Sequence, residues 1–141
     1  QGENAQTLVI MARFYTALAT DGHAARPEIV SRAPDRERII ELDSAQLQGL
    51  RDAMAGVVSG RGTAGSAQIQ GLTVAGKTGT AQNPPYPDHA WFVGFAPATD
   101  PKIVVAVFVE YGEHGYVAAR YATKVMEKYL KAAVAPQVIT E

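Results

Sequence analysis

Apolar residues in the second half of the chain follow the pattern of three consecutive strands. Segments rich in apolar and β-branched residues run from Leu72 to Gln82, from His89 to Pro97 and from Ile103 to Glu110. Short stretches rich in proline, aspartate or asparagine separate them, as expected of turns. The third segment is apolar without alternation, which predicts cover on both faces of the sheet that it joins.

Helical patterns precede these strands. From Asn4 to Thr20 the only charged residue is Arg13, which predicts a helix that is apolar on nearly all sides and buried within something larger. A short strand or extended segment is expected from Ala25 to Ala33. A second helix begins at Asp43, whose side chain can form a capping box with Gln46. The apolar residues on one face of this helix, and the glycines that close it, are Leu47, Leu50, Met54, Val57, Gly60 and Gly62.

A last helix, from about Tyr116 to Ala133, is expected to pack on the sheet. The loops at Gly60 to Gly65, Asn83 to Asp88 and Gly112 to Gly115 are short, so they indicate connections within one domain. The chain is therefore predicted to form an α/β domain whose antiparallel sheet is covered by helices. The residues expected on the packed side of the last helix are Ala118, Ala122, Val125, Met126 and Tyr129.

Composition excludes several classes of function. The chain has 141 residues, enough for one modest domain, and its formal net charge of -1 gives no reason to expect nucleic acid as a partner. The three histidines lie far apart in the sequence, so neither a metal site nor a cofactor is predicted. The sequence has no cysteine, so it forms neither a disulfide nor a thiolate metal site. It also has no apolar run suited to a bilayer, so any membrane anchor is expected outside these residues.

The segment Gly-Lys-Thr-Gly-Thr-Ala-Gln, from Gly76 to Gln82, fits two unrelated motifs. Together with Gly71 it has the G-x-x-x-x-G-K-T form of a phosphate-binding P-loop. A P-loop lysine opens a helix, whereas prolines crowd the stretch from Pro84 to Pro87, so the nucleotide-binding hypothesis is disfavoured. Lys77-Thr78-Gly79 is also the K-T-G element of serine acyl-transfer enzymes. An ordinary edge strand, with a lysine that prevents aggregation, stays a further alternative.

The residues around this segment favour the acyl-transfer hypothesis. Gly-Lys-Thr-Gly-Thr-Ala precedes Trp-Phe-Val-Gly-Phe-Ala-Pro by about ten residues, and the ordered set closely resembles the transpeptidase domain of penicillin-binding proteins. Gln1-Gly2-Glu3, Met11-Ala12-Arg13 and the Arg26 to Val30 segment resemble its class B, elongation-specific branch. The resemblance extends from Gln1 to about Leu130. It implies an α/β fold in which a five-stranded antiparallel sheet packs between helices.

The same resemblance implies a function in cell-wall synthesis. It implies serine acyl transfer on D-alanyl-D-alanine stem peptides, a reaction that cross-links peptidoglycan and that β-lactams inhibit. It also implies an extracytoplasmic location on a membrane-anchored protein, with a SEDS-type glycan polymerase as a partner. A β-lactamase or a β-lactam sensor of the same fold remains the alternative.

Within this resemblance, four consecutive residues form the expected substrate strand. Lys77 supplies a positive charge for the terminal carboxylate of a stem peptide or a β-lactam, and the Thr80 N–H can donate to the developing oxyanion. Gly79 leaves the approach open, and the Thr78 and Thr80 hydroxyls can bond the same carboxylate. We assign catalytic roles to Lys77 and Thr80, and substrate binding to Lys77, Thr78, Gly79 and Thr80. His89 is left out of the site, because histidines at loop ends are usually solvated.

The nucleophile that this chemistry needs is not in the sequence. Serine acyl transfer of this class requires an S-x-x-K element and a second S-x-N element. No serine of the chain has a lysine three residues later or an asparagine two residues later; the serines are Ser31, Ser44, Ser59 and Ser66. We therefore expect residues 1–141 to be the C-terminal portion of one transpeptidase domain, whose N-terminal portion carries the nucleophile.

Overall fold

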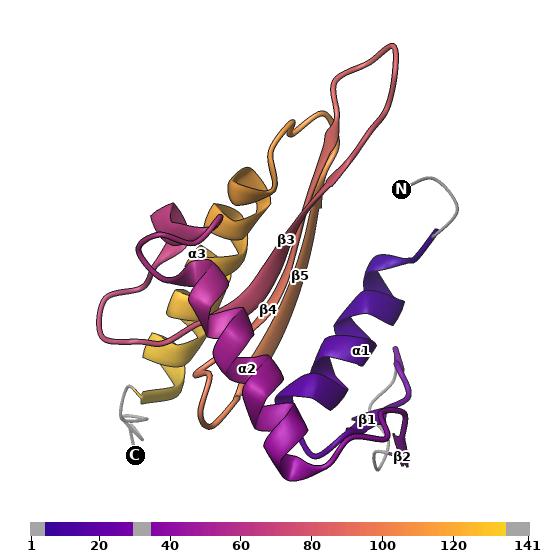
Figure 1. Ribbon diagram of the computed structural model, residues 1–141, viewed down its shortest axis with the longest axis vertical. Helices are drawn as coiled ribbons and strands as arrows, with labels where there is room; N and C mark the ends of the chain where they lie inside the picture. Colours follow the sequence, from indigo (N-terminus) through magenta and orange to yellow (C-terminus); the bar gives the residue numbers. More distant parts are fainter. Residues whose placement is uncertain (1–4, 30–34, 135–141) are drawn as a thin grey trace, which may run out of the picture.

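The structure is a computed structural model that describes residues 5–29 and 35–134. Its elements follow one another as α1 (Leu8–Ala19), β1 (His23–Ala25), β2 (Arg36–Arg38), α2 (Ser44–Val58), η1 (Gly65–Ala67), β3 (Ala75–Ala81), β4 (His89–Ala96), β5 (Ile103–Val109) and α3 (Gly115–Val134). A twisted sheet lies between α3 on one side and α1 on the other, and α2 crosses in front of it (Figure 1). The predicted α/β arrangement, an antiparallel sheet packed between helices, is confirmed.

The central sheet contains the three strands that the apolar pattern predicts. Its order is β3-β4-β5, and both pairings are antiparallel. The register of the first pair runs from Ala75 opposite Phe95 to Ala81 opposite His89. Consequently β3, which carries the Lys77 to Thr80 segment, is an edge strand of the described sheet.

The first strand begins later than predicted, at Ala75 instead of Leu72. The cause is local, because Leu72 pairs with Ile69 in an isolated bridge and its N–H donates to the Ile69 carbonyl at 3.2 Å. Gly71 makes this tight turn possible with a φ of +76°, in the left-handed region that glycine adopts without steric cost. The chain therefore enters the sheet only after the turn is complete.

Two apolar cores cover the two faces of the sheet. On one face, Val93 and Phe95 of β4 pack with Tyr15 and Leu18 of α1. On the other face, Phe92 of β4 packs with small and apolar side chains of α3. Burial raises the pKa of the Tyr15 hydroxyl above its ordinary value of 10.0. The alternation of Phe92, Val93 and Phe95 along one strand thus ties a helix to each face.

Helix α1 is capped at both ends but is only half covered. The Thr7 side chain accepts from the Ile10 N–H at 3.2 Å, and the Arg51 guanidinium of α2 donates to the Leu18 carbonyl at 2.8 Å. The outer face of this helix leaves large apolar side chains in contact with solvent: Val9 at 54%, Ile10 at 52% and Phe14 at 44% exposure. This outer face agrees with the prediction of a helix that is apolar on nearly all sides.

The segment from Ala25 to Ala33, predicted as a short strand or extended segment, is strand only at Ala25 in the part that the structure describes. The strand is His23–Ala25, and it pairs with Arg36–Arg38. It ends before Pro27, which has no N–H to offer to a ladder; residues 30–33 lie outside the described part. Glu37 of β2 bonds Arg13 of α1, and this hydrogen bond and the charge of Arg13 lower the pKa of Glu37.

Helices α2 and α3 have about the predicted bounds, but some residues predicted on their buried faces are exposed. The Asp43 and Gln46 capping box is present at the start of α2, yet Leu50 is exposed. On α3, Val125 and Tyr129 are 51% and 50% exposed. Small side chains let α3 approach the sheet closely and place its buried stripe away from these two residues. The buried residues of that stripe are Ala118, Ala119, Ala122, Thr123 and Met126.

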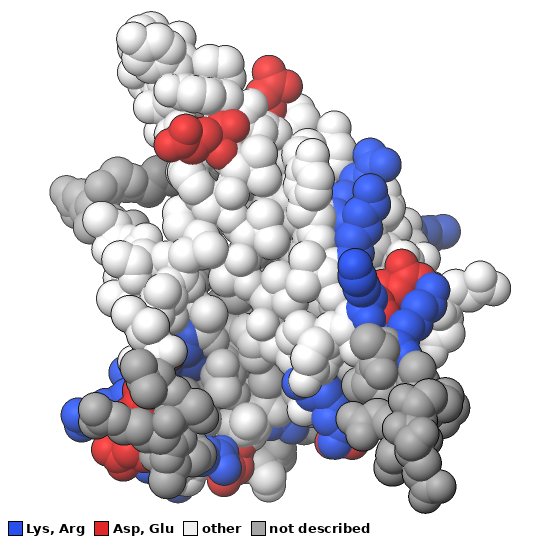
Figure 2. All heavy atoms as spheres, turned by 180° about the vertical axis from the view of Figure 1, so that it is seen from behind, with Lys and Arg blue, Asp and Glu red and all other residues white. Residues whose placement is uncertain are grey.

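Strand β5 has helices on both faces, as its unbroken apolar sequence predicts. Helix α1 contacts it on one side and α3 on the other, but every side chain from Ile103 to Val109 remains partly exposed. Within the described residues, its outer edge pairs with no further strand. Seen from behind, the middle of this side of the molecule is a broad area without charged side chains (Figure 2).

Candidate functional site

The candidate site is the outer half of β3, where the sequence places Lys77, Thr78, Gly79 and Thr80. Lys77 and Thr80 are exposed, and Thr78 and Gly79 are half-buried. Lys77 lies opposite Val93, so it shares the sheet face that α1 covers. Thr78 lies opposite Phe92, on the face that α3 covers. The strand thus presents its cation on one face and its threonine hydroxyls on the other.

The backbone of this strand presents alternate residues to the open edge. The Ala75 carbonyl lies beside Gly94 of β4, so Ala75 bonds toward the sheet. The Thr78 carbonyl instead accepts a hydrogen bond from the Lys77 ammonium, with a distance of 2.8 Å between Nζ and the oxygen. Because residues of the same parity share a direction on an edge strand, Thr80 also points its N–H and C=O outward.

A loop after α2 contributes a residue that the sequence analysis missed. The Thr63 and Thr78 hydroxyl oxygens lie 2.9 Å apart, within hydrogen-bond distance. The loop folds back because Ala64 donates its N–H to the Val57 carbonyl at 2.9 Å, and a Cβ at Gly62 would lie 2.1 Å from the same oxygen. No spacing in the sequence relates residues 63 and 78, although the glycines around Thr63 are a signal of a tight turn.

The start of α3 also contacts the candidate strand. A Cβ built on Gly115 would lie 2.8 Å from both the Thr78 Cβ and the Gly79 carbonyl oxygen. Only glycine allows the first residue of this helix to approach the strand so closely. The sequence pattern gives the start of the helix, but it does not show that this start touches the Lys77 to Thr80 segment.

An aromatic side chain covers the site on the Lys77 face. Trp91 lies opposite Gly79 in the pairing of β3 and β4, and a Cβ at Gly79 would lie 3.2 Å from the Trp91 Cβ. The Trp91 ring packs against the Phe108 ring of β5, with a distance of 4.6 Å between their centroids. The lack of a side chain at Gly79 therefore keeps the strand backbone accessible beside a bulky neighbour.

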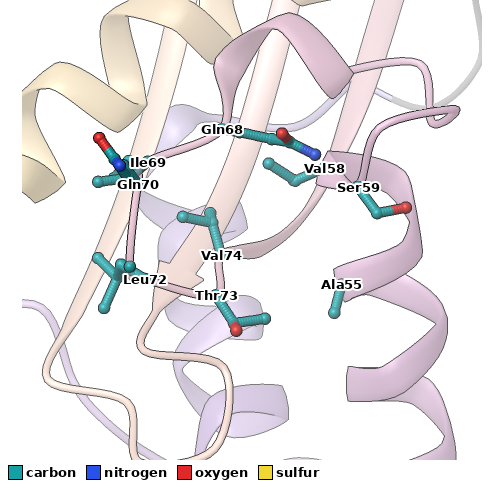
Figure 3. A pocket seen from close by; sticks show the side chains of 10 residues that line it. Ala55, Val58, Ser59, Gln68, Ile69, Gln70, Leu72, Thr73 and Val74 are labelled. Carbon is teal, nitrogen blue, oxygen red and sulfur yellow. The ribbon is translucent and has the colours of Figure 1, made fainter.

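A pocket in the described part of the protein lies away from this strand segment. It has a volume of about 540 Å³ and lies between the end of α2 and the approach to β3 (Figure 3). None of the ten residues that line it is charged, and none belongs to the Lys77 to Thr80 segment: Ala55, Val58, Ser59, Gln68, Ile69, Gln70, Gly71, Leu72, Thr73 and Val74. The pocket therefore carries no cation, whereas the edge of β3 carries Lys77 beside the Thr78 carbonyl.

The structure rejects the P-loop hypothesis. Lys77 and Thr78 lie in the middle of β3, and the chain continues as strand to Ala81. A P-loop requires its lysine at a helix N-terminus, where backbone N–H groups surround the phosphates. Gly76 is buried against the Phe92 ring and the Val93 carbonyl, so it cannot offer its backbone to a phosphate. Within residues 5–29 and 35–134, no three histidine, aspartate or glutamate side chains come together to hold a metal ion.

Comparison with known proteins agrees with this geometry. The family model of the penicillin binding protein transpeptidase domain matches residues 1–131. A probable peptidoglycan D,D-transpeptidase PenA of Neisseria meningitidis is 37% identical over 119 residues, which cover 78% of this chain and 20% of the relative. The chain thus spans about a fifth of the length of this curated relative.

Solved structures of the same kind superimpose on the chain. The D,D-transpeptidase domain of a peptidoglycan glycosyltransferase from Eggerthella lenta has a TM-score of 0.80 and 35% identity, with 91% of this chain and 33% of that chain covered. An imipenem acyl-enzyme complex of penicillin-binding protein A from Mycobacterium tuberculosis has a TM-score of 0.79 and 30% identity, with 92% and 32% covered. The match of the family model over residues 1–131 is decisive, and the chain belongs to the penicillin-binding protein transpeptidase domain family.

Proposed function

We propose that this chain provides the substrate-binding strand of a serine D,D-transpeptidase that cross-links peptidoglycan. The observation that carries the proposal is the open edge of β3, where the Lys77 ammonium lies beside outward backbone groups. An extended peptide can add to such an edge as a further strand. The backbone then gives the peptide its register, and the cation selects its charged end.

The Thr80 carbonyl and N–H, which point to the open edge of β3, can bind the substrate peptide and stabilise the charge that develops in the reaction. Its carbonyl can accept from an amide N–H of the stem peptide, as in a sheet ladder. Its N–H can donate to the oxygen that becomes negative when a serine attacks the peptide carbonyl. A donor that the sheet already holds in place stabilises this charge without reorganising at the moment of reaction.

Lys77 suits the end of the substrate. The stem peptide ends in D-alanyl-D-alanine, so its terminal carboxylate carries a full negative charge within reach of the strand. The Lys77 ammonium is exposed and donates to the neutral Thr78 carbonyl, and it attracts this carboxylate. The Thr78 and Thr80 hydroxyls can donate to the same group. A β-lactam carries a comparable carboxylate and would use the same residues.

The covalent step needs residues that the sequence of this chain does not contain. In the proposed reaction, a serine oxygen bonds to the carbonyl carbon of the penultimate D-alanine, and the terminal D-alanine leaves with a proton on its amine. The amino group of a second stem peptide then displaces the serine and forms the cross-link. We propose that the full-length protein supplies the S-x-x-K and S-x-N elements opposite β3. The imipenem acyl-enzyme complex of penicillin-binding protein A from Mycobacterium tuberculosis supports this chemistry.

Two uncovered apolar surfaces support the proposal that further parts of the domain pack here. The outer face of α1 exposes Val9, Ile10 and Phe14, and the outer edge of β5 has no partner strand within the described residues. Exposed apolar area of this kind marks an interface in most soluble proteins. We propose that the nucleophile-bearing lobe covers α1 and that two further strands extend the sheet beyond β5.

The proposed substrate lies outside the cytoplasm, so we propose an extracytoplasmic location for the protein. In the described part of the chain, no helix has the length and the apolar character that crossing a bilayer requires. We place the membrane anchor outside these residues. A SEDS-type glycan polymerase is the partner that we propose, since cross-linking acts on newly made glycan strands.

The test uses the full-length protein that contains this chain. We expect stable labelling by a fluorescent penicillin, and release of more than one equivalent of D-alanine from a donor peptide only when an acceptor amine is present to displace the serine. Rapid turnover of a chromogenic cephalosporin, with no cross-linked product, would identify a β-lactamase instead. Labelling without any cross-linked product would identify a β-lactam sensor. No labelling at all would reject the acyl-transfer proposal.

A further inference from the structure

The turn that joins β5 to α3 is held in a conformation that its residues do not favour. Tyr111 and Glu113 have φ angles of 56° and 58°, in the left-handed region that side chains other than that of glycine rarely adopt. The turn crosses the end of β4, because a Cβ at Gly112 would lie 2.8 Å from the Ala90 Cβ. It ends at Gly115, which lies against Thr78 and Gly79. Contacts outside the turn must therefore hold it in place.

His89, the first residue of β4, provides one of these contacts. Its Nδ1 accepts a hydrogen bond from the Tyr111 N–H at 3.1 Å, so its proton in this arrangement is on Nε2. Its ring lies between two aromatic rings, with centroid distances of 5.4 Å to Tyr111 and 5.2 Å to Phe108. The imidazole is therefore fixed by packing while its nitrogen holds the first left-handed residue of the turn.

The residue before His89 holds the other left-handed residue. The Glu113 N–H donates to the Asp88 carbonyl at 2.9 Å, and the Asp88 carboxylate accepts from the Asn83 N–H at 3.3 Å. Two consecutive residues of the β3–β4 connection thus hold the two strained positions of the turn. Because the turn leads directly into Gly115, this pair of contacts sets where the helix start meets the candidate strand.

We propose that His89 is a positioning residue for acyl transfer. Through its hydrogen bond to Tyr111 it holds the β5–α3 turn in place. This turn places Gly115 against Thr78 and Gly79, and so fixes the position of the strand backbone that binds the substrate. This inference rests on the proposed function of the strand. The backbone of His89 lies opposite Ala81 of β3, whereas its side chain bonds and packs against Tyr111, so a substitution of the side chain acts through the turn. A shift of about 1 Å in a catalytic group costs on the order of 100-fold in rate, which makes such support measurable.

Two substitutions at this position in the full-length protein separate the hydrogen bond from the packing. His89→Asn places its amide oxygen near the position of Nδ1 and keeps an acceptor for the Tyr111 N–H. His89→Phe keeps an aromatic ring between Phe108 and Tyr111 but has no acceptor. We expect the acylation rate constant for a penicillin to fall roughly 10- to 100-fold in His89→Phe. In His89→Asn it should stay within about threefold of the natural protein, as rescue of the hydrogen bond requires.

A second measurement does not depend on catalysis. Hydrogen exchange followed by mass spectrometry should show faster exchange in residues 78–80 and 111–115 for His89→Phe and unchanged exchange for His89→Asn. Should the natural protein not be acylated at all, the proposed function fails, and exchange alone decides the role of His89. Melting temperatures of both variants control for folding. If His89→Phe does not fold, His89→Leu, which also lacks an acceptor, replaces it.

The two variants give a clear decision. Loss of acylation and protection in the phenylalanine or leucine variant, with recovery in the asparagine variant, supports the proposal. Equal losses in both kinds of variant would assign His89 a packing role only and overturn it. Exchange and acylation that match the natural protein in every folded variant would overturn it as well.

Discussion

The hydroxyl oxygens of Thr63 and Thr78 lie 2.9 Å apart, which ties the loop after α2 to the edge strand β3. A carboxylate accepts hydrogen bonds but cannot donate them, so Thr78 can bind one only by donating its proton outward. Thr63 is then the donor to Thr78. This contact therefore orients the Thr78 hydroxyl for the carboxylate that we propose as the ligand of this strand.

Removal of the Thr63 hydroxyl tests this orientation. We expect Thr63→Val in the full-length protein to lower the second-order rate constant of β-lactam acylation by roughly 3- to 10-fold, since one neutral hydrogen bond contributes about 1 kcal/mol. Thr63→Ser keeps the hydroxyl and should acylate at the natural rate. Stopped-flow fluorescence of the antibiotic gives both constants. A valine variant as fast as the serine variant would mean that Thr78 needs no such partner.

Lys77 is expected to have the largest effect of any side chain in the described part of the site. Lys77→Ala should slow acylation by roughly 100- to 10,000-fold, the scale expected when a positioned charged group is lost. Lys77→Arg keeps the charge but changes the shape of the charged group, so its acylation rate should lie between those of the natural protein and of Lys77→Ala. Thermal melting shows whether each variant is folded. Normal acylation by folded Lys77→Ala would make Lys77 an ordinary edge-strand lysine.

Two substitutions of Thr80 distinguish the contribution of its side chain to acylation from that of its backbone N–H. Thr80→Ala removes only the hydroxyl contact, so its acylation rate should fall by less than about tenfold. Thr80→Pro also deletes the N–H that we assign to the oxyanion, so its loss should be roughly 100-fold or more. Acylation kinetics of the two variants, compared at equal folded fraction, test this order. Equal rates for alanine and proline would move the oxyanion donor away from Thr80.

A polypeptide of only these 141 residues should behave differently from the full-length protein. It should form no adduct with penicillin, because its sequence contains no S-x-x-K element. It should also self-associate or bind a hydrophobic dye, because the outer face of α1 and the edge of β5 are uncovered. Intact-mass spectrometry and sedimentation measure these properties. A well-folded monomer without dye binding would contradict the proposal that another lobe packs here.

Strands and capping residues were predictable because their signals are local. The apolar runs of β4 and β5 follow from strand periodicity, and the Asp43 and Gln46 capping box follows from a three-residue spacing. Periodicity alone does not order strands in a sheet. The edge position of β3 was instead expected from the resemblance to the family, and the strand order agrees with it. The roles of Lys77 and Thr80 stay predictions, which the substitutions above test.

Features that depend on contacts far apart in the sequence were not predictable. No local pattern relates Thr63 to Thr78, or Gly115 to Gly79, because the fold alone brings these residues together. On α3 the sequence predicts Ala118, Ala122 and Met126 correctly on the packed side, but the buried stripe continues through Ala119 and Thr123 and leaves Val125 and Tyr129 exposed. The end of a loop predicts a solvated His89, whereas this residue is half-buried and accepts a hydrogen bond from the Tyr111 N–H.

The Phe92 ring of β4 lies against two glycines that face each other across the sheet, Gly76 of β3 and Gly94 of β4. A methyl group added at Gly76 would lie 2.3 Å from the Phe92 Cζ, and one added at Gly94 would lie 2.8 Å from the Phe92 Cε1. Backbone carbonyls block the same space, since the Cβ at Gly94 would also lie 2.6 Å from the Ala75 oxygen and that at Gly76 2.9 Å from the Val93 oxygen, so neither position accepts another amino acid unless the ring and the backbone both move. On the function that we propose, substitutions that give resistance to β-lactams in this part of the protein are expected at the exposed end of β3 and in the loops around it, while Gly76 and Gly94 stay glycine.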